Sequence, residues 1–138
     1  MRRIGILTGG GDVPGLNAAV KALVWRLLDD PCDCEVIGLR RGWASLVNII
    51  PERDADNSEW FTPLTRLNTR AIDRTGGTVL HTSRLNPAIS RAEHIPAHLE
   101  SEKGLPDERG RYDLTSAAMR VLNFLQLDAL VALGGDGT

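Results

Sequence analysis

Residues 3–17 read RIGILTGGGDVPGLN, and this stretch decides the fold. The apolar run Ile4–Leu7 predicts a buried strand, the glycines 9–11 follow it, and an apolar stretch with helical spacing begins at Leu16. Glycines let the backbone come close to an anion and adopt a positive φ, so that N–H groups point inward. The start of a helix adds unsatisfied N–H donors and the positive end of the helix dipole. Strand, glycine turn and helix together predict a phosphate-binding site.

The end of the chain repeats this arrangement. Residues 129–133 (ALVAL) form a second apolar run, which leads directly into the glycine-rich segment 134–138 (GGDGT). A run that is apolar on both faces predicts an interior strand of a parallel sheet. One glycine turn after a strand is more often a simple tight connection, but two turns at two strand ends favour binding of one phosphate-bearing ligand.

The composition is that of a globular protein. The 138 residues are 42% hydrophobic, which is enough for one domain with a core. No apolar run approaches the ~20 residues that span a bilayer, and no signal peptide is evident after Met1. A net charge of −2 gives no general attraction to nucleic acid or membranes. Cys32 and Cys34 are one residue apart, which is more typical of a reduced turn than of a disulfide or metal site. We expect a soluble, cytoplasmic domain.

The first part of the chain predicts a βαβ unit. Apolar residues at helical spacing run from Leu16 to Leu28, where only Lys21 and Arg26 are charged, and residues 35–39 predict the next strand. A helix this apolar is buried on more than one side, as in a layered domain. Strands joined by such a crossover are parallel. The predicted fold class is therefore α/β, with a doubly wound, mainly parallel sheet of the Rossmann type.

The remaining elements are less strongly marked. They are a loop over residues 51–58, an edge strand over 60–65, a short helix over 69–74, a strand over 78–82, a polar excursion over 86–111, and a helix that Asp113 or Thr115 caps and that ends near Leu125. We expect the strand over 78–82 to deliver Ser83 and Arg84 to the loop beyond it.

Three motifs of this sequence, in this order, resemble the N-terminal part of 6-phosphofructokinase. They are TGGGDVPGLNAA at 8–19, GGTVLHTSR at 76–84 and GGDGT at 134–138, and they reach from end to end of the chain. The family phosphorylates fructose 6-phosphate to the 1,6-bisphosphate in glycolysis, using MgATP or, in some branches, pyrophosphate. The resemblance implies that residues 1–138 are an N-terminal nucleotide-binding domain that is incomplete at the second glycine loop.

The resemblance also implies roles for individual residues. The positions that would bind the nucleotide are Gly10, Gly11, Arg84, Leu85, Gly135, Asp136, Gly137 and Thr138. Gly10 would lie against the phosphates, and Asp136 would hold Mg²⁺ through its carboxylate or a bound water. Phosphoryl transfer depends on positioning and electrostatic stabilisation, so backbone N–H groups, an arginine and a carboxylate-bound magnesium ion suit it.

Gly137 bears on the phosphoryl donor. The ATP users of the family resemble this sequence there, whereas pyrophosphate users typically have aspartate. A side chain at this position would crowd the α-phosphate of ATP, which pyrophosphate lacks. The resemblance therefore favours ATP as the donor.

The sequence also departs from the family pattern. The family's catalytic base is an aspartate in a Thr-Ile-Asp-Asn-Asp type segment that would follow Thr138, and the groups that hold the sugar phosphate also lie in later parts. We therefore assign no catalytic residue and expect the 138-residue chain alone not to turn over. Lys21 and Trp25 stand where many bacterial members carry effector-binding arginines, so that control is not assumed. The excursion over 86–111 is longer than in compact bacterial enzymes. For the full-length enzyme, the resemblance implies a homo-oligomer with ATP and fructose 6-phosphate as substrates.

Several alternatives remain open. The GGDGT loop also occurs in NAD and diacylglycerol kinases, and the chain could be a non-catalytic nucleotide-binding module. Asp12 fits bonding to loop amides better than metal binding. Trp43 could stack near the adenine or pack in the core. His94 and His98 are four residues apart but have no third ligand nearby, so they do not predict a metal site.

Overall fold

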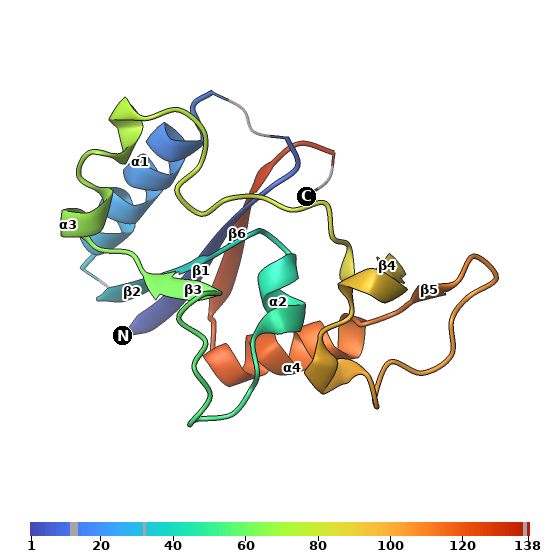
Figure 1. The fold of residues 1–138 in the computed structure, drawn as a ribbon. Coiled ribbons are helices and arrows are strands. Elements are labelled where there is room, and N and C mark those ends of the chain that lie inside the picture. Colours follow the sequence, from blue (N-terminus) through green and yellow to red (C-terminus); the bar gives the residue numbers. More distant parts are fainter. Residues whose placement is uncertain (12–13, 32, 137) are drawn as a thin grey trace.

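The computed structural model describes residues 1–11, 14–31, 33–136 and 138. Its main feature is a four-stranded sheet in the order β3-β2-β1-β6 (Figure 1). The strands are β1 (Arg2–Gly9), β2 (Cys34–Leu39), β3 (Phe61–Pro63) and β6 (Ala129–Gly134). β1 is parallel to both β2 and β6, and the short edge strand β3 is antiparallel to β2. This mostly parallel sheet confirms the predicted α/β class, and β3 lies within the edge strand predicted over 60–65.

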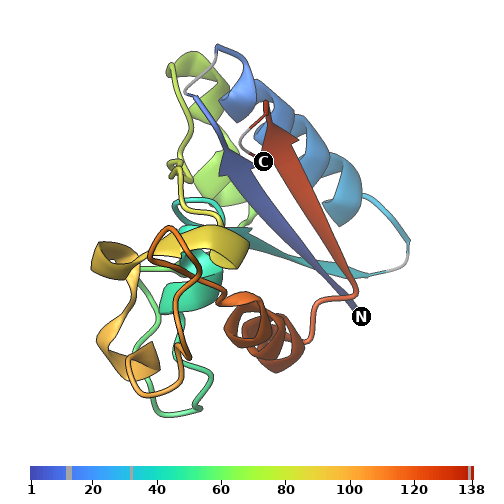
Figure 2. The same ribbon diagram turned by 90° about the vertical axis from the view of Figure 1, so that its right-hand side faces the viewer.

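Helices cover both faces of the sheet. Their bounds are α1 (Leu16–Leu28), α2 (Ala44–Asn48), α3 (Arg66–Thr69) and α4 (Thr115–Leu125). Figures 1 and 2 show α1 on one side of the sheet and α2 and α4 on the other. The doubly wound architecture is thus confirmed. Within the described chain no helix combines the length and apolar character needed to cross a membrane.

The alternation of side chains along β1 explains the two layers. Ile6 belongs to the buried cluster on the α1 side, together with Val24, whereas its neighbour Leu7 packs with Val121 of α4 on the other side. Both side chains are fully buried. Because successive residues of a strand point to opposite faces, an uninterrupted apolar run is what a strand covered on both faces requires.

The helix α1 has the predicted bounds. Gly15 precedes it with a φ of 97°, a left-handed conformation that glycine adopts without strain, and the Gly15 carbonyl accepts the Ala19 amide at 2.9 Å. At the other end the amide of Asp29 donates to the Trp25 carbonyl. The left-handed turn at Gly15 and the proline that follows at Pro31 therefore set the ends of this helix.

The predicted strand over 78–82 is wrong. The amide of His81 donates to the Thr78 carbonyl at 3.1 Å and closes a turn, and His81 has a φ of 58°. The Leu80 carbonyl accepts the Arg41 amide, and the Val79 amide donates to the side chain of Asn17. These backbone groups are therefore taken by partners from other parts of the chain, and no strand ladder forms.

The predicted short helix over 69–74 is also wrong in its bounds. The chain forms α3 and then a separate 3-10 turn over Ile72–Arg74. The earlier start follows from a capping box: Thr65 Oγ1 accepts the Asn68 amide, and Asn68 Oδ1 accepts the Thr65 amide at 2.8 Å. Such reciprocal bonds satisfy the free N–H groups of a first turn.

The excursion over 86–111 is irregular, as predicted. It contains three 3-10 turns (Pro87–Ile89, Ala92–His94 and Ala97–Leu99). Strand β4 (Ser90–Arg91) lies between the first two turns and pairs with β5 (Arg111–Tyr112), at the end of the excursion, in a small two-stranded sheet. After it, Asp113 Oδ1 accepts the Thr115 amide at 2.9 Å at the start of α4, which agrees with the predicted cap region. Hydrogen bonding by the Thr115 side chain, and then by its backbone amide, lowers the pKa of the Asp113 carboxyl.

The last strand differs from the interior strand that its apolar run predicts. Within the described chain β6 lies at the edge of the sheet, with β1 on its one paired side. Its residues alternate between half-buried and exposed, and none falls in the buried class. Within the described chain β6 therefore has one free edge and is less covered than β1, whose residues from Ile4 to Gly9 are buried.

Candidate functional site

The two glycine loops leave the sheet at the same end. β1 and β6 are parallel, and Gly9 is the register partner of Gly134. Gly10 and Gly135 therefore begin their loops on neighbouring strands, and both views place the ends of these strands side by side (Figures 1 and 2). The carboxyl ends of adjacent parallel strands are where open α/β sheets bind ligands.

The ends of β1 and β6 can lie this close together because the glycines there have no side chains. A Cβ added to Gly134 would collide with the Gly9 carbonyl oxygen and with Oγ1 of Thr138. A Cβ added to Gly9 would lie 2.9 Å from the same Thr138 Oγ1. The Thr138 amide donates to the Gly135 carbonyl at 3.1 Å, which folds the second loop back over the strand ends. Gly10 has a φ of 73°, whereas Gly11 faces open space.

A cavity of about 430 Å³ lies beside the second loop. Its lining residues are Trp43, Arg84, Asn86, Asp136 and Thr138. They come from three separate segments, and they bring the guanidinium of Arg84 and the carboxylate of Asp136 to one space. Neither of these two side chains has a hydrogen bond or an ion pair within the part of the chain that the structure describes. Both charged groups are therefore free to bind a ligand.

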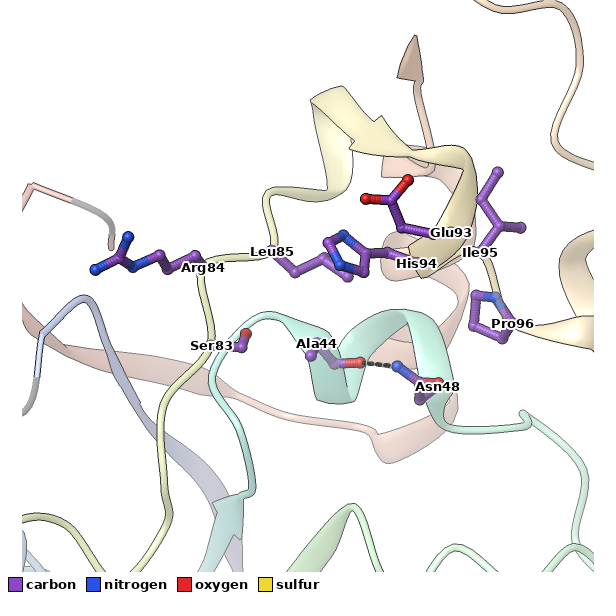
Figure 3. Close-up of a pocket in the computed structure, with 9 residues that line it drawn as sticks. All are labelled: Ala44, Asn48, Ser83, Arg84, Leu85, Glu93, His94, Ile95 and Pro96. Atoms are coloured by element: carbon purple, nitrogen blue, oxygen red, sulfur yellow. Dashed lines mark hydrogen bonds between the residues drawn. The ribbon is translucent and has the colours of Figure 1, made fainter. Parts of the chain in front are cut away.

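A second cavity, of about 450 Å³, adjoins the first through Arg84 (Figure 3). Its floor is α2, where Asn48 Nδ2 donates to the Ala44 carbonyl at 2.8 Å, and its walls include Leu85 and Ile95. Figure 3 shows Arg84 extended away from Leu85. Leu85 thus lies in the second cavity and not in the first. Apolar walls with a few polar groups are typical of sites that take a planar organic group.

Ser83 also lines the second cavity. Its Oγ is buried and has no hydrogen-bond partner within the described residues. A buried hydroxyl without a partner costs free energy, so a ligand with a polar edge would gain by bonding to it. The sequence analysis placed Ser83 beside Arg84 in the loop after residues 78–82 but assigned it no role, and it did not identify Asn48 or Asn86, because nothing in their local pattern distinguishes them.

Two polar residues of the first motif hold the segment that carries Arg84. Thr8, fully buried in β1, donates from Oγ1 to the His81 carbonyl at 2.8 Å and accepts from Thr78 Oγ1 at 2.9 Å. Asn17 in the first turn of α1 accepts the Val79 amide at 2.6 Å. The first and second motifs are therefore one hydrogen-bonded unit, which the sequence analysis missed.

Asn17 also bonds to Thr75, which lies on the N-terminal side of the same segment. Its Nδ2 donates to the Thr75 carbonyl and to Thr75 Oγ1, both at 3.2 Å, and Asn17 is almost completely buried. The signal for this role was present in the sequence as a lone polar residue in the first turn of an otherwise apolar helix. A buried amide side chain is retained only where its donors and acceptors are satisfied.

Lys21 and Trp25 bind the neighbouring segment of the chain. Lys21 Nζ donates to the Arg70 carbonyl at 2.7 Å and to Asp73 Oδ1 at 2.8 Å, and this contact lowers the pKa of the Asp73 carboxyl. Trp25 Nε1 donates to Thr69 Oγ1 at 3.1 Å. Both side chains thus connect α1 to the chain around α3.

Some predicted positions lie outside the described residues. They are Asp12, Cys32 and Gly137. His94 and His98 lie in separate 3-10 turns, and the described residues contain no group of three or more histidine, cysteine, aspartate or glutamate side chains that could hold a metal ion.

The sequence matches the Phosphofructokinase family over residues 3–138. The chain belongs to this family. The match covers nearly all of the 138 residues, and it confirms the resemblance carried by the three motifs. This match to the Phosphofructokinase family sets aside the alternatives of an NAD kinase and a diacylglycerol kinase.

Named phosphofructokinase relatives use two donors. The chain is 38% identical over 136 residues to a pyrophosphate--fructose 6-phosphate 1-phosphotransferase of Dictyoglomus thermophilum, which covers 99% of this chain and 30% of that protein. It is 33% identical over 138 residues to an ATP-dependent 6-phosphofructokinase of Clostridium botulinum, covering 100% of this chain and 33% of that protein. The chain spans about a third of the length of these relatives.

Solved phosphofructokinase structures have the same fold. The phosphofructokinase of Pichia pastoris in the T-state matches with a TM-score of 0.66 and 27% sequence identity, over 99% of this chain and 11% of that chain. The phosphofructokinase of Saccharomyces cerevisiae matches with a TM-score of 0.64 and 26% identity, over 99% and 14%. These likenesses agree with an incomplete Rossmann-like domain of a phosphofructokinase.

Proposed function

We propose that residues 1–138 are the N-terminal nucleotide-binding domain of an ATP-dependent 6-phosphofructokinase. The full-length enzyme transfers a phosphoryl group from MgATP to fructose 6-phosphate and forms fructose 1,6-bisphosphate in glycolysis. One observation carries this proposal: two glycine loops meet at adjacent strand ends, beside a cavity lined by Arg84 and Asp136. Following the family, we place the enzyme in the cytoplasm as a homo-oligomer.

The donor would occupy both adjoining cavities, with its phosphates in the first and its nucleoside in the second. Backbone N–H groups of Gly10, Gly11 and Gly135 bind phosphate oxygens, and Arg84 neutralises charge on the transferred group. Thr138 closes the second loop over the strand ends. Leu85 and the α2 side of the second cavity take the nucleoside end. Gly137 lies outside the described residues, and its assignment to the loop under the triphosphate follows from the family resemblance alone.

Asp136 fits the binding of Mg²⁺. Its carboxylate is exposed, lines the first cavity and has no partner within the described residues. Mg²⁺ usually binds one or two carboxylates together with substrate phosphates, so a site with one carboxylate beside a phosphate loop suits it. Bound Mg²⁺ would neutralise the charge that develops on the phosphates during transfer. Asp136 would hold and orient the ion from the protein side.

The phosphoryl donor is tested with the full-length gene product. Initial rates are measured with fructose 6-phosphate and either ATP or pyrophosphate, each with excess Mg²⁺. We expect ATP to give the higher kcat/KM, because Gly137 leaves room for an α-phosphate. A higher kcat/KM with pyrophosphate would contradict the choice of ATP and favour the activity named for the Dictyoglomus relative.

The same assay applies to the 138-residue chain alone. We expect no detectable fructose 1,6-bisphosphate, because the family's general base is not among these residues and a missing base costs about 10²–10⁴-fold in rate. Turnover by this chain would show that the sugar site and the base are supplied from within residues 1–138, and it would overturn the assignment of the domain.

A further inference from the structure

A third cavity, of about 440 Å³, adjoins the other two: it shares Arg84 and Asn86 with the first cavity, and Arg84, Leu85 and His94 with the second. It is lined by Arg84, Arg91, Arg111 and His94 together with neutral residues, and none of its lining residues is acidic. Asp136 and Thr138 do not reach it. The described structure therefore contains a cationic cavity that adjoins the space in which we place the donor's phosphates but is not lined by the glycine loops.

Two of its arginines are held directly opposite each other. Arg91 on β4 is the register partner of Arg111 on β5, in a sheet that has one other residue pair. Like charges directly opposite each other on paired strands are destabilising. Such a short ladder gains little from pairing in return, because two-stranded sheets are marginal even when longer. An anion bound between the two guanidinium groups would remove this repulsion.

Arg111 is oriented from behind by Asp107. The Asp107 Oδ2 atom accepts from Arg111 Nε at 3.0 Å and from Nη2 at 2.9 Å, while Oδ1 accepts the Arg111 amide at 2.9 Å. These bonds lower the pKa of the Asp107 carboxyl. They leave Arg111 Nη1 without a partner within the described residues. A guanidinium whose one edge is fixed presents its remaining N–H groups with little loss of freedom.

Arg91 is less constrained. Its nearest carboxylate oxygen belongs to Glu93 at 3.8 Å, and both side chains are largely exposed, so this ion pair is weak. Glu93 does not line the cavity. Figure 3 shows Arg84 extended away from His94, which leaves Arg91 and Arg111 as the guanidinium groups for this cavity.

We propose that this cavity binds the phosphoryl group of a small molecule between Arg91 and Arg111. Paired N–H donors of guanidinium groups match the oxygens of a phosphoryl group, and the charge-assisted bonds that they form are the strong ones. The site lies in the excursion over 86–111 and is separate from the glycine loops. We expect the ligand held there to be a phosphorylated molecule other than the donor, because Asp136 and Thr138 of the second glycine loop do not line this cavity. The site does not depend on the proposed function.

The test uses the full-length gene product and inorganic pyrophosphate as the probe. Pyrophosphate binding is measured by titration calorimetry in the presence of saturating MgATP, which occupies the glycine loops. We expect Arg91→Ala to weaken pyrophosphate binding about tenfold or more, since it removes a charge-assisted hydrogen bond. Arg109→Ala is the matched control, because Arg109 lies in the same excursion, makes no side-chain contact within the described residues and does not line the cavity.

Arg111→Ala is a second variant, with the same expected loss. Because it also breaks the contact with Asp107, its folding is checked by MgATP affinity, which should equal that of the unchanged protein. Equal pyrophosphate affinities of Arg91→Ala and Arg109→Ala would overturn the proposal. So would complete loss of pyrophosphate binding when MgATP is added, because the anion would then belong to the donor site. Failure of MgATP to bind at all would contradict the proposed function and leave an Arg91-dependent pyrophosphate site standing.

Discussion

Gly134 lies opposite Gly9 where β1 and β6 end. A Cβ at Gly134 would collide with the Gly9 carbonyl oxygen, which is backbone and cannot rotate away, as well as with the Thr138 hydroxyl. A Cβ at the next residue, Gly135, meets nothing within 4 Å. The two glycines therefore have different roles. Gly134 permits the strands to meet, and Gly135 leaves backbone N–H groups accessible.

This difference predicts the result of a pair of substitutions. We expect Gly134→Ala to lower the free energy of unfolding by about 1–3 kcal/mol, because the collision forces the strand ends apart. Gly135→Ala, the matched control, should change it by less than about 0.5 kcal/mol. Urea unfolding followed by circular dichroism measures both. Equal effects of the two substitutions would refute the close approach of the loops.

Asp136 is the residue on which magnesium binding depends. We expect Asp136→Asn in the full-length gene product to lower kcat/KM for ATP about 10²–10³-fold, since it removes the carboxylate while keeping its shape. The concentration of Mg²⁺ needed for half-maximal rate should rise in parallel. Asp54→Asn is the control, because Asp54 is an exposed carboxylate in the loop over 51–58. An unchanged Mg²⁺ requirement in Asp136→Asn would show that Asp136 does not hold the ion.

At the scale of elements, the side chain of Asn17 joins α1 to the segment over 75–79. We expect Asn17→Ala to lower the free energy of unfolding by about 1–3 kcal/mol, because it removes the almost completely buried amide side chain that bonds to the Val79 amide and to Thr75. In the full-length gene product it should also raise KM for ATP, because the segment that carries Arg84 loses its anchor. Asn123→Ala, on the exposed side of α4, should change both quantities little. An unchanged KM for ATP together with reduced stability would show that the bonds of Asn17 do not position the ATP site.

The 3-10 turn that contains His98 packs against α2 and couples stability to pH. Burial lowers the pKa of His98 from its ordinary value, and a nearby arginine, Arg120, contributes in the same direction. Because the folded pKa is the lower one, the unfolded chain binds a proton more readily. The stabilisation is therefore full above the unfolded pKa of about 6.5 and is lost as pH falls through the folded pKa.

We accordingly expect the free energy of unfolding to fall between about pH 7 and pH 5, and to fall less in His98→Gln than in the unchanged chain. Urea unfolding at the two pH values measures this. His94→Gln is the matched control, because His94 is exposed in a neighbouring turn. If the loss of stability with falling pH is the same in all three proteins, His98 is not its source.

The molecule as a whole is uneven in how well its sheet is covered. β1 is buried between β2 and β6, whereas β6 has a free edge and no fully buried residue. Exposed strand edges pair with other chains, and lysine on an edge strand opposes this. We expect the 138-residue chain to self-associate in sedimentation velocity experiments, and Ala132→Lys, at an exposed position of β6, to reduce the association. A monodisperse monomer with a sharp cooperative melt would contradict this prediction.

Local pattern was sufficient for the elements that are apolar by themselves. The apolar runs of β1, β2 and β6 and the helical spacing of α1 are visible in the sequence, because a strand between two layers of helices, or a helix packed on a sheet, requires apolar side chains at the period of the element. The two glycine loops are visible for the same reason, since each follows such a run directly. The sequence could thus predict the α/β class and the strand ends at which the site lies.

Other features depend on residues far apart in the chain. Thr8 and Asn17 bond to groups 58 to 73 positions away, and these bonds replace the strand expected over 78–82 with a turn. Likewise only the folded chain sets Arg91 opposite Arg111 and brings Arg84 and Asp136 to one cavity. A hydrogen bond or a charge contact depends on position in space, and no local period in the sequence records which distant groups will meet.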